Sequence, residues 1–340
     1  MINTVYRLIA PRRFEIAFSD IDIKDKVIVR PSHLSICNAD MRYFLGTRDA
    51  KVLKEKLPLA LIHEGIGTVV KDDSNTFQIG DTVVMVPNIP CESDDYIAEN
   101  YLRSSKFCGS SADGFLSEYV ALNKDRVVKL PEFIDKNVAA FTEMVSVGYH
   151  AVERFKKIAH NRKTAIGVWG DGNLSLITAL ILKKTFCDSK IYIFGINADK
   201  LSDFSFADET FLTTQIPENL EIDHAFECVG GNGSSIAIEQ IIKYIRPEGT
   251  IALMGVSEYA VPVNTRMILE KGLRLYGTSR CGKHDFEKTV ELYKAYPDMI
   301  SYLSRLVSNV VEINNFSDIK KAFDTDAKKS YGKTIMHWNL

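Results

Sequence analysis

The stretch TAIGVWGDGNLSLITALILKKTF, residues 164–186, decides the class of fold. Its first part is a short apolar run typical of a buried strand, and its last part has apolar residues at helical spacing. Further strand-like runs follow, and a helical pattern lies between two of them at residues 233–245. Strands that alternate with helices indicate parallel βαβ units and a doubly wound sheet. The further strand-like runs are residues 190–196, 222–230, 249–256 and 273–279.

The turn inside the opening stretch has the spacing of a phosphate-binding loop. Gly170 and Gly172 occupy the first two glycine positions of G-x-G-x-x-G, and Ser175 stands at the third. The first glycine permits a tight turn, and the second lets the backbone approach a pyrophosphate at the positive end of the next helix. A plain strand–helix turn is the alternative, but the position between a strand and a helix favours cofactor binding. The predicted cofactor contacts are Gly170, Gly172, Asn173, Leu174 and Ser175.

The end of the next strand indicates which dinucleotide is bound. An NAD site usually has an acidic residue there, which binds the ribose 2′-OH. Gly195 takes this position, and Lys200 lies just downstream. Since the position has no carboxylate to repel a 2′-phosphate, the sequence favours NADP(H), with Gly195 and Lys200 at the cofactor. Under a shifted register, Asp199 would be the acidic residue instead.

Length and composition limit the class of protein. The chain has 340 residues, 46% hydrophobic and 25% charged, so a soluble globular protein of two domains is expected. The formal net charge of −2 argues against a nucleic-acid partner. No apolar run reaches the roughly 18 residues of a membrane helix, and the first residues lack the apolar core of a signal peptide. We therefore expect a cytoplasmic protein whose six scattered cysteines are mostly reduced.

The part before the glycine loop has a different rhythm. From residue 1 to about residue 130, short apolar runs are separated by polar turns, which predicts an all-β unit of short strands. After the last strand-like run, residues 285–296 have a helical pattern, and the tail must pack back against another part of the chain.

Polar residues interrupt one apolar run of this β-rich part, LPLALIHEGIGTVV at residues 57–70. Its Glu64 would be costly to bury without a partner. A divalent cation would neutralise Glu64, and zinc accepts carboxylate, imidazole and thiolate ligands, here from Glu64, Glu143, His63 and Cys37. Asp40 could orient the imidazole ring. A single buried cysteine or histidine is more often an ordinary core residue, but the set of five predicts a catalytic metal site.

With these motifs, the sequence resembles the medium-chain dehydrogenase/reductase superfamily of the zinc alcohol dehydrogenase type. The shared patterns are C-x-x-D, H-E-G followed by G-x-V, F-x-x-G-D-x-V, E-x-x-S-V-G-x-H-A and the glycine loop. The resemblance implies an α/β protein: a GroES-like β-rich catalytic domain at 1–145 and 286–340, and a Rossmann domain at 146–285. It implies Cys37, His63 and Glu64 as zinc ligands, Glu143 as a further ligand or water-binding carboxylate, and a homodimer.

Three departures from the family pattern affect these expectations. The loop that holds a second, structural zinc in many members keeps only Cys91 and Cys108 here, so one zinc per subunit is expected. Ala39 replaces the Ser or Thr that begins the usual proton relay, and a zinc-bound water held by Glu64 or Glu143 is a substitute acid. Arg42 replaces a frequent His and suggests an anionic substrate.

Longer strings resemble one group within this superfamily, the bacterial ribulose-5-phosphate reductases. Examples are VIVRPSHLSICNADMRYF, LIHEGIGTVV and PEGTIALMGVSEY. The resemblance implies zinc-dependent reduction of D-ribulose 5-phosphate to D-ribitol 5-phosphate with NADPH, for CDP-ribitol and teichoic acid or capsule synthesis. It also implies a working partner, a ribitol-5-phosphate cytidylyltransferase.

The substrate phosphate has two candidate sites. Arg42, Arg48 and Lys51 form a basic cluster after Cys37, although a charged stretch is often only a solvated surface. Arg280, followed by Lys283, is the other candidate and could equally hold the cofactor phosphates. Two other functions stay open: a zinc-dependent dehydrogenase of a neutral polyol or alcohol, and a non-enzymatic binding protein on the same fold.

Overall fold

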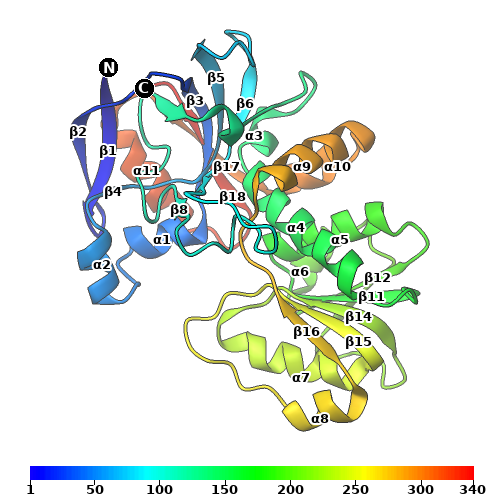
Figure 1. Ribbon diagram of the computed structural model, residues 1–340. Coiled ribbons are helices and arrows are strands. Elements are labelled where there is room, and N and C mark those ends of the chain that lie inside the picture. The colour runs from blue at the N-terminus through cyan, green and yellow to red at the C-terminus, as the bar shows by residue number, and fades with distance from the viewer. The chain divides into compact units, whose positions relative to one another are not determined.

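The strand expected at the start of the glycine-loop stretch is β11, the central strand of a six-stranded parallel sheet in the computed structural model, which describes residues 1–340. The strand order β13-β12-β11-β14-β15-β16 is that of a doubly wound sheet. Helices α5 and α7 lie on opposite faces of it (Figure 1). All residues of β11 are buried because both faces are covered.

This unit comprises residues Val147–Arg280. A strand that the sequence pattern did not indicate, β13, forms one edge of the sheet. Its residues are half-buried or exposed, so it lacks the apolar run of the central strands. The elements are β11 (Ala165–Trp169), α5 (Asn173–Thr185), β12 (Lys190–Gly195), α6 (Ala198–Leu201), β13 (Glu209–Leu212), β14 (Ile222–Glu227), α7 (Ser234–Tyr244), β15 (Ile245–Leu253), α8 (Thr265–Lys271) and β16 (Arg274–Gly277).

The other unit comprises Met1–Ser146 and Cys281–Leu340. The chain returns to this unit at Cys281, before the position 286 expected from sequence, because the whole of α9 belongs to it. The helix α4 (Thr142–Ile158) begins in this unit and continues into the other. Its strands are β1 (Ile2–Ala10), β2 (Arg13–Asp20), β3 (Val27–Ser35), β4 (Leu59–Ala60), β5 (Glu64–Asp72), β6 (Thr82–Met85), β7 (Asn88–Ile89), β8 (Lys106–Phe107), β9 (Val120–Leu122), β10 (Val127–Lys129), β17 (Val307–Ile313) and β18 (Lys333–Trp338).

Helices also occur in the segment that we expected to be all-β. Two short helices, α1 and α2, stand between β3 and β4, where charged residues separate the apolar runs. The remaining helices of this unit follow the strands or belong to the tail. The helices are α1 (Asn38–Phe44), α2 (Ala50–Lys56), α3 (Lys136–Ala139), α9 (Lys283–Ala295), α10 (Met299–Leu303) and α11 (Phe316–Asp326).

The C-terminal tail enters the main sheet of this unit, whose order is β10-β6-β5-β3-β18-β17. Strand β3 lies between β5 and β18, and Ser35 pairs with both Glu64 and Ile335. The register therefore brings the start of β18 close to the start of β5, although the two are far apart in sequence.

With a parallel sheet covered by helices in one unit and a β-rich fold in the other, the predicted α/β class is confirmed.

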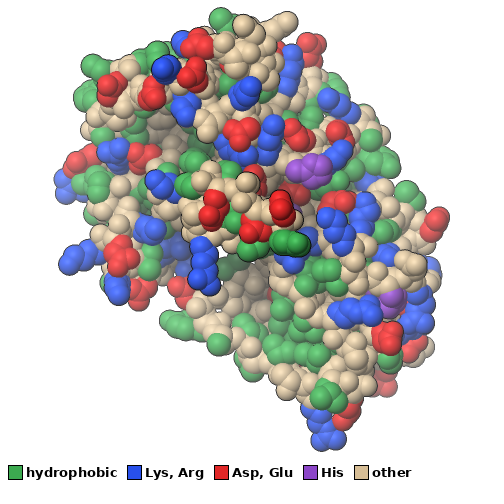
Figure 2. All heavy atoms as spheres, in the orientation of Figure 1, with side chains coloured by type: hydrophobic (Ala, Val, Ile, Leu, Met, Phe, Trp, Pro, Cys, Tyr) green, Lys and Arg blue, Asp and Glu red, His purple; other side chains and the backbone are tan.

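Acidic and basic side chains are interspersed on the visible face of the molecule, as the small net charge leads one to expect (Figure 2). None of the helices combines the length and the apolar character that crossing a membrane requires.

Candidate active site

Three of the predicted metal ligands meet in the first unit. The Sγ of Cys37, a ring nitrogen of His63 and a carboxylate oxygen of Glu64 lie within 4.8 Å of one another. Cys37 caps the N-terminus of α1, His63 precedes β5, and Glu64 is its first residue. His63 and Glu64 are buried and Cys37 is half-buried. A thiolate, an imidazole and a carboxylate at such distances form a donor set suited to zinc.

The backbone just before His63 is held in an unusual conformation. Ile62 has φ 73, in the left-handed region that a β-branched residue rarely adopts. Its N–H donates a hydrogen bond of 3.0 Å to Asp40, and its carbonyl lies where a Cβ on Gly114 would be only 2.2 Å away. Such strain persists where the surroundings enforce it, often at functional sites.

Asp40 holds the parts of this cluster together. Its carboxylate accepts hydrogen bonds from the N–H groups of Cys37 and Ile62 at 3.1 and 3.0 Å, and its Oδ1 lies 3.6 Å from the Nδ1 of His63. Burial acts to raise the pKa of Asp40, but His63 and the two N–H groups outweigh it and lower the pKa. The Nδ1 of His63 thus faces a carboxylate, an arrangement that directs the other ring nitrogen to a metal.

A lysine that the sequence analysis missed lies against Glu64. Lys333, the first residue of β18, donates a hydrogen bond of 2.8 Å to Oε1 of Glu64, and its Nζ lies 2.7 Å from Oε2. Both side chains are almost completely buried. Glu64 therefore has an ammonium of the protein beside it, in addition to the metal that the sequence predicted as its partner. The signal in the sequence was a lysine at the start of KTIMHW, a run in which Ile335, Met336 and Trp338 are apolar.

Glu143 is not within the same distance of all three ligand atoms. It lies on the first turn of α4, buried, and the Sγ of Cys281 is 4.0 Å from its Oε1. Burial raises the pKa of Glu143 to about 7, with Glu64 acting in the same direction and His63 and Lys333 opposing it. The four predicted ligands are thus assembled in part, with Glu143 beside the group of three.

The glycine loop of the second unit has the shape expected of it. Gly170 has φ 125, and a Cβ on it would lie 2.4 Å from the Oγ of Ser175. Gly172 caps the N-terminus of α5 and has open space where a side chain would be. Asn173 and Leu174 begin the helix and are half-buried.

The end of β12 differs from the expectation in one respect. Gly195 is its last residue, and Lys200 is half-buried on α6. A carboxylate is nevertheless present, because Asp171 reaches over from the glycine loop. Its Oδ2 accepts hydrogen bonds from the N–H groups of Ile196 and Asn197 at 2.8 and 2.9 Å. The prediction that no carboxylate lies here is wrong, since the tertiary fold brings one from another turn.

Comparison with known proteins identifies the family. A family model of the alcohol dehydrogenase GroES-like domain matches residues 23–132, and one of zinc-binding dehydrogenases matches residues 197–295. Ribulose-5-phosphate reductase 1 of Staphylococcus aureus (strain NCTC 8325 / PS 47) is 53% identical over 339 residues, which cover 99% of each chain. The chain belongs to the zinc-dependent medium-chain dehydrogenases. The expected family and its GroES-like and Rossmann folds are confirmed.

Two further similarities support a place beside the ribulose-5-phosphate reductases of this family. Ribulose-5-phosphate reductase of Bacillus spizizenii is 50% identical over 341 residues, all of both chains. The crystal structure of S. aureus TarJ in complex with NADPH has a TM-score of 0.90 and 48% identity, with 100% of both chains covered.

The residues present fit the metal and the cofactor of such a dehydrogenase. The Oε2 of Glu64 is buried 2.7 Å from the Lys333 Nζ, and a carboxylate oxygen with one cation beside it keeps a further lone pair that can bind a metal. In the second unit, the open space at Gly172 and the helix N-terminus behind it suit a pyrophosphate. Both donor sets agree with the chemistry of a zinc-dependent dehydrogenase.

The predicted phosphate-binding residues differ in their surroundings. Arg48 is half-buried over the ring of Tyr43, at 4.2 Å, and its buried Nε has no hydrogen-bond partner. Arg42 is half-buried on α1, whereas Lys51 is exposed on α2. Arg280 is exposed in the second unit, and Lys283 pairs with Glu287 on α9. Arg48 is thus a packed residue of the first unit rather than part of a solvated surface.

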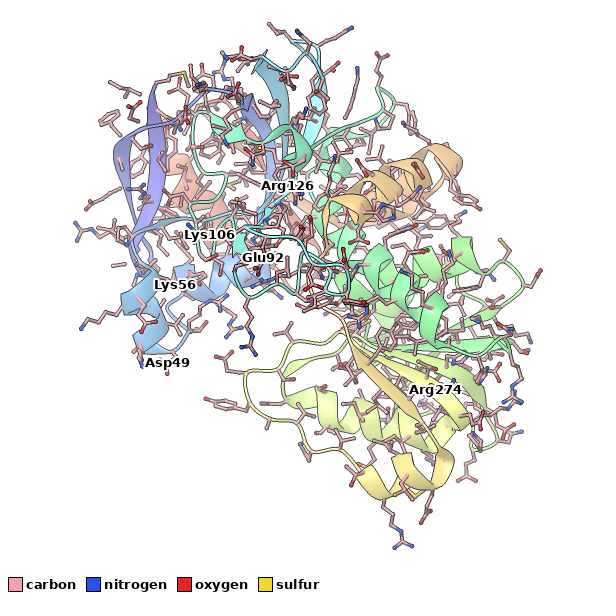
Figure 3. The ribbon with its side chains drawn as sticks, in the orientation of Figure 1. Asp49, Lys56, Glu92, Lys106, Arg126 and Arg274 are labelled. Atoms are coloured by element: carbon pink, nitrogen blue, oxygen red, sulfur yellow. The ribbon has the colours of Figure 1, made fainter.

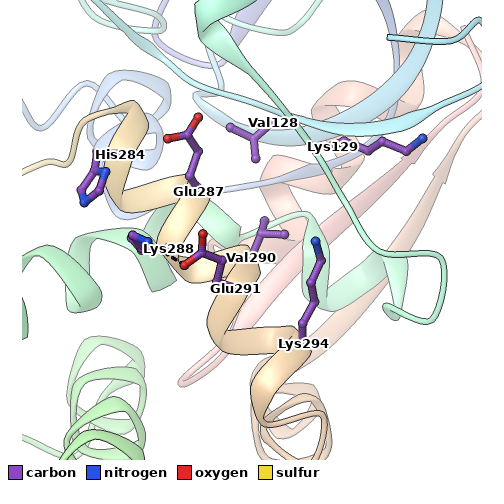
Figure 4. A pocket seen from close by; sticks show the side chains of 8 residues that line it. All are labelled: Val128, Lys129, His284, Glu287, Lys288, Val290, Glu291 and Lys294. Carbon is purple, nitrogen blue, oxygen red and sulfur yellow. Dashed lines mark hydrogen bonds and ion pairs between the residues drawn. The ribbon is translucent and has the colours of Figure 1, made fainter. Parts of the chain in front are cut away.

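A surface hollow of about 440 Å³ lies between β10 and α9 and includes none of these residues. Its lining alternates lysines and glutamates, and Lys288 and Glu291, three residues apart on α9, form an ion pair at its edge (Figure 4). Paired charges and an open surface do not indicate a catalytic cleft. The residues that line it are Val128, Lys129, His284, Glu287, Lys288, Val290, Glu291 and Lys294.

Proposed function

We propose that the protein reduces the ketone of D-ribulose 5-phosphate with NADPH, giving D-ribitol 5-phosphate. The observation that carries the proposal is the buried group of Cys37, His63 and Glu64 in a chain 53% identical to a ribulose-5-phosphate reductase along its length. In the reaction the carbonyl carbon accepts a hydride and the carbonyl oxygen accepts a proton, so a ketone becomes a secondary alcohol. This alcohol can supply CDP-ribitol for teichoic acid or capsule synthesis.

In this proposal Cys37, His63 and Glu64 hold one zinc ion. When bound, zinc supplies a Lewis acid that stabilises negative charge on the substrate oxygen. Asp40 orients the ring of His63, so that one nitrogen faces the carboxylate and the other faces the metal position. Lys333 keeps Glu64 in place through a buried ion pair, which restricts the carboxylate to the side of the cluster.

The second unit holds the nucleotide in this proposal. NADPH supplies the hydride, and the chain supplies the binding site and the orientation. Gly170 and Gly172 let the backbone approach the pyrophosphate, and the N-terminus of α5 favours its negative charge. Lys200 adds a positive charge beyond β12.

Turnover with three sugars tests the proposal. Oxidation of NADPH is followed at its nicotinamide absorbance with ribulose 5-phosphate, unphosphorylated ribulose and xylulose 5-phosphate. We expect ribulose 5-phosphate to be reduced with the highest kcat/KM. Faster reduction of unphosphorylated ribulose would favour the neutral-polyol dehydrogenase, and no turnover of any sugar would favour a binding protein.

Variants of two arginines locate the phosphate. Because a guanidinium can bind a phosphate through two hydrogen bonds, we expect Arg48→Ala to raise the KM for ribulose 5-phosphate by about tenfold, without a matching change for unphosphorylated ribulose. Arg42→Ala, six residues nearer Cys37 and on α1, tests the other arginine of the cluster. If neither changes the KM, the phosphate binds elsewhere.

We propose further that the protein works as a cytoplasmic homodimer and associates with a ribitol-5-phosphate cytidylyltransferase. Strand β16 ends the six-stranded sheet and leaves one side of its backbone for a second copy. The six cysteines are all free thiols, which suits a reducing compartment. Light scattering after size exclusion measures the mass of the protein alone and of its mixture with the cytidylyltransferase. A monomeric mass of the protein alone would contradict the homodimer. A mass that does not change on mixing would contradict the complex.

A further inference from the structure

The carboxylate of Asp171 occupies the place where dinucleotide-binding enzymes of this fold recognise the ribose. In an NAD site, an acidic side chain at the end of the second strand binds the 2′-OH. Here that strand, β12, ends at Gly195. A Cβ placed on Gly195 would lie 2.8 Å from the Cβ of Asp171 and 3.0 Å from its Oδ2. The side chain of Asp171 thus fills the space that a residue at 195 would otherwise take.

The same carboxylate is fixed by two backbone donors. The N–H groups of Ile196 and Asn197, which follow β12, donate to Oδ2 at 2.8 and 2.9 Å. Two successive N–H groups that point at one oxygen form a small anion site. Because Asp171 lies between the two glycines of the loop, the turn that receives the pyrophosphate also delivers this carboxylate.

We infer that Asp171 determines the discrimination between NADPH and NADH. This inference rests on the proposed use of a nicotinamide dinucleotide. A hydroxyl at the ribose 2′ position can donate a hydrogen bond to the carboxylate, whereas a 2′-phosphate meets a like charge and finds the two N–H groups already occupied. Asp171 therefore favours the 2′-OH of NADH and weakens the preference for NADPH that Gly195 and Lys200 would otherwise produce.

The test is the binding of both cofactors to the full-length zinc-loaded protein, without sugar. Dissociation constants of NADPH and NADH are measured by nicotinamide fluorescence for the wild type and for Asp171→Asn. Asparagine keeps an oxygen that can accept from Ile196 and Asn197 but has no charge. We expect the dissociation constant of NADH divided by that of NADPH to rise by about tenfold. This is the effect on binding of losing one hydrogen bond to a charged group. A ratio that stays the same or falls would overturn the inference.

Asp199→Asn is the matched control. Asp199 is exposed at the start of α6, the helix that follows β12, and its substitution removes the same charge. We expect its ratio to stay near that of the wild type, so an equal shift in both variants would assign the effect to net charge and overturn the role of Asp171. Thermal unfolding of each variant shows whether it is folded.

The outcome separates this inference from the proposed function. If the wild type binds neither cofactor, the proposed reductase function fails. If it binds NADPH and reduces ribulose 5-phosphate but the ratio is unaffected by Asp171→Asn, only the role of Asp171 is lost.

Discussion

At the scale of single residues, the pair of Glu64 and Lys333 shows how a charge is kept inside this protein. Both side chains are buried, and their charged atoms are 2.7 Å apart. Burial acts to lower the pKa of Lys333, but Glu64 outweighs it and raises the pKa above its ordinary value. The lysine therefore stays protonated, and Glu64 has a permanent cation whether or not a metal is bound.

Removing the lysine should destabilise the metal-free protein. We expect Lys333→Met to lower the free energy of unfolding by about 3 kcal/mol, because it leaves the Glu64 carboxylate buried without a cation. The double variant Glu64→Gln with Lys333→Met should recover part of this loss, since the uncompensated charge is gone. Thermal unfolding of zinc-free samples by circular dichroism measures both. An unchanged midpoint for Lys333→Met would show that the pair contributes nothing.

A second buried residue, His224, makes the free energy of unfolding depend on pH. Its Nδ1 accepts a hydrogen bond from the N–H of Thr250 at 3.1 Å, and its Nε2 lies 3.0 Å from the carbonyl of Arg162. These partners require the neutral ring with its proton on Nε2. Burial, with nearby His160, lowers the pKa of His224 to about 4 from the usual 6.5.

The sign of the effect follows from this lowered pKa. Between pH 6.5 and pH 4 the unfolded chain protonates His224 and the folded chain does not. The contribution of His224 to the free energy of unfolding is therefore complete above pH 6.5. It is lost as the pH falls, by roughly 3 kcal/mol near pH 4. His224→Gln, whose amide can serve the same partners, should flatten the fall in the thermal midpoint over this range.

Comparison of the variant with the wild type is needed because other groups titrate in the same range. His33 also has a pKa lowered to about 4, chiefly by burial and by His337, and acts in the same direction. Glu143, with a pKa raised to about 7 chiefly by burial, acts in the opposite direction. Identical pH profiles for His224→Gln and the wild type would contradict the prediction.

At the scale of elements, the loop between β7 and β8, residues 90–105, is fastened by an ion pair. Arg126, labelled in Figure 3, is almost fully buried and donates to both oxygens of Glu99 at 2.8 and 3.1 Å. Glu99 also accepts from the N–H of Lys283 at the start of α9, at 2.7 Å. Cys91 is exposed and Cys108 is buried, so their thiols lie in different surroundings. The loop is therefore held by charges, in the stretch where the family resemblance implies a second zinc in many members.

Breaking this ion pair should release the loop. We expect Arg126→Met to destabilise the first unit by about 3 kcal/mol, because Glu99 loses its cation, and to speed cleavage by trypsin at Arg103. Lys124→Met removes a nearby exposed cation and is the matched control. Limited proteolysis followed by mass spectrometry measures the cleavage. Equal cleavage in the two variants would mean that Arg126 does not hold the loop.

At the scale of the whole molecule, one zinc per chain is the expected metal content. The structure assembles one group of metal-ligating side chains, Cys37, His63 and Glu64. We expect elemental analysis to give one zinc per chain, and a chelator to abolish NADPH oxidation until zinc is returned. Cys37→Ser should lose the zinc, whereas Cys91→Ser, at an exposed thiol, should keep it. Two tightly held zinc ions per chain would contradict this prediction.

Several features of the fold and site could be predicted from local sequence. The alternation of apolar strands and helices after residue 164 predicted the parallel sheet, because the period of apolar residues reflects which faces are buried. The spacing of Gly170 and Gly172 predicted the phosphate-binding turn, since only glycine allows that backbone path. The unusual setting of Glu64 in an apolar run indicated a buried charge that needs a partner.

The partners themselves were decided by the tertiary structure. Lys333 meets Glu64 because β3 pairs with both β5 and β18, and Asp171 reaches the end of β12 because β11 and β12 lie side by side. The sequence by itself determined which segments are buried and which groups bear charge, since both depend on neighbouring residues along the chain. Which charges meet depends on strand order and register, which are set by contacts between distant segments, and only the folded chain contains them.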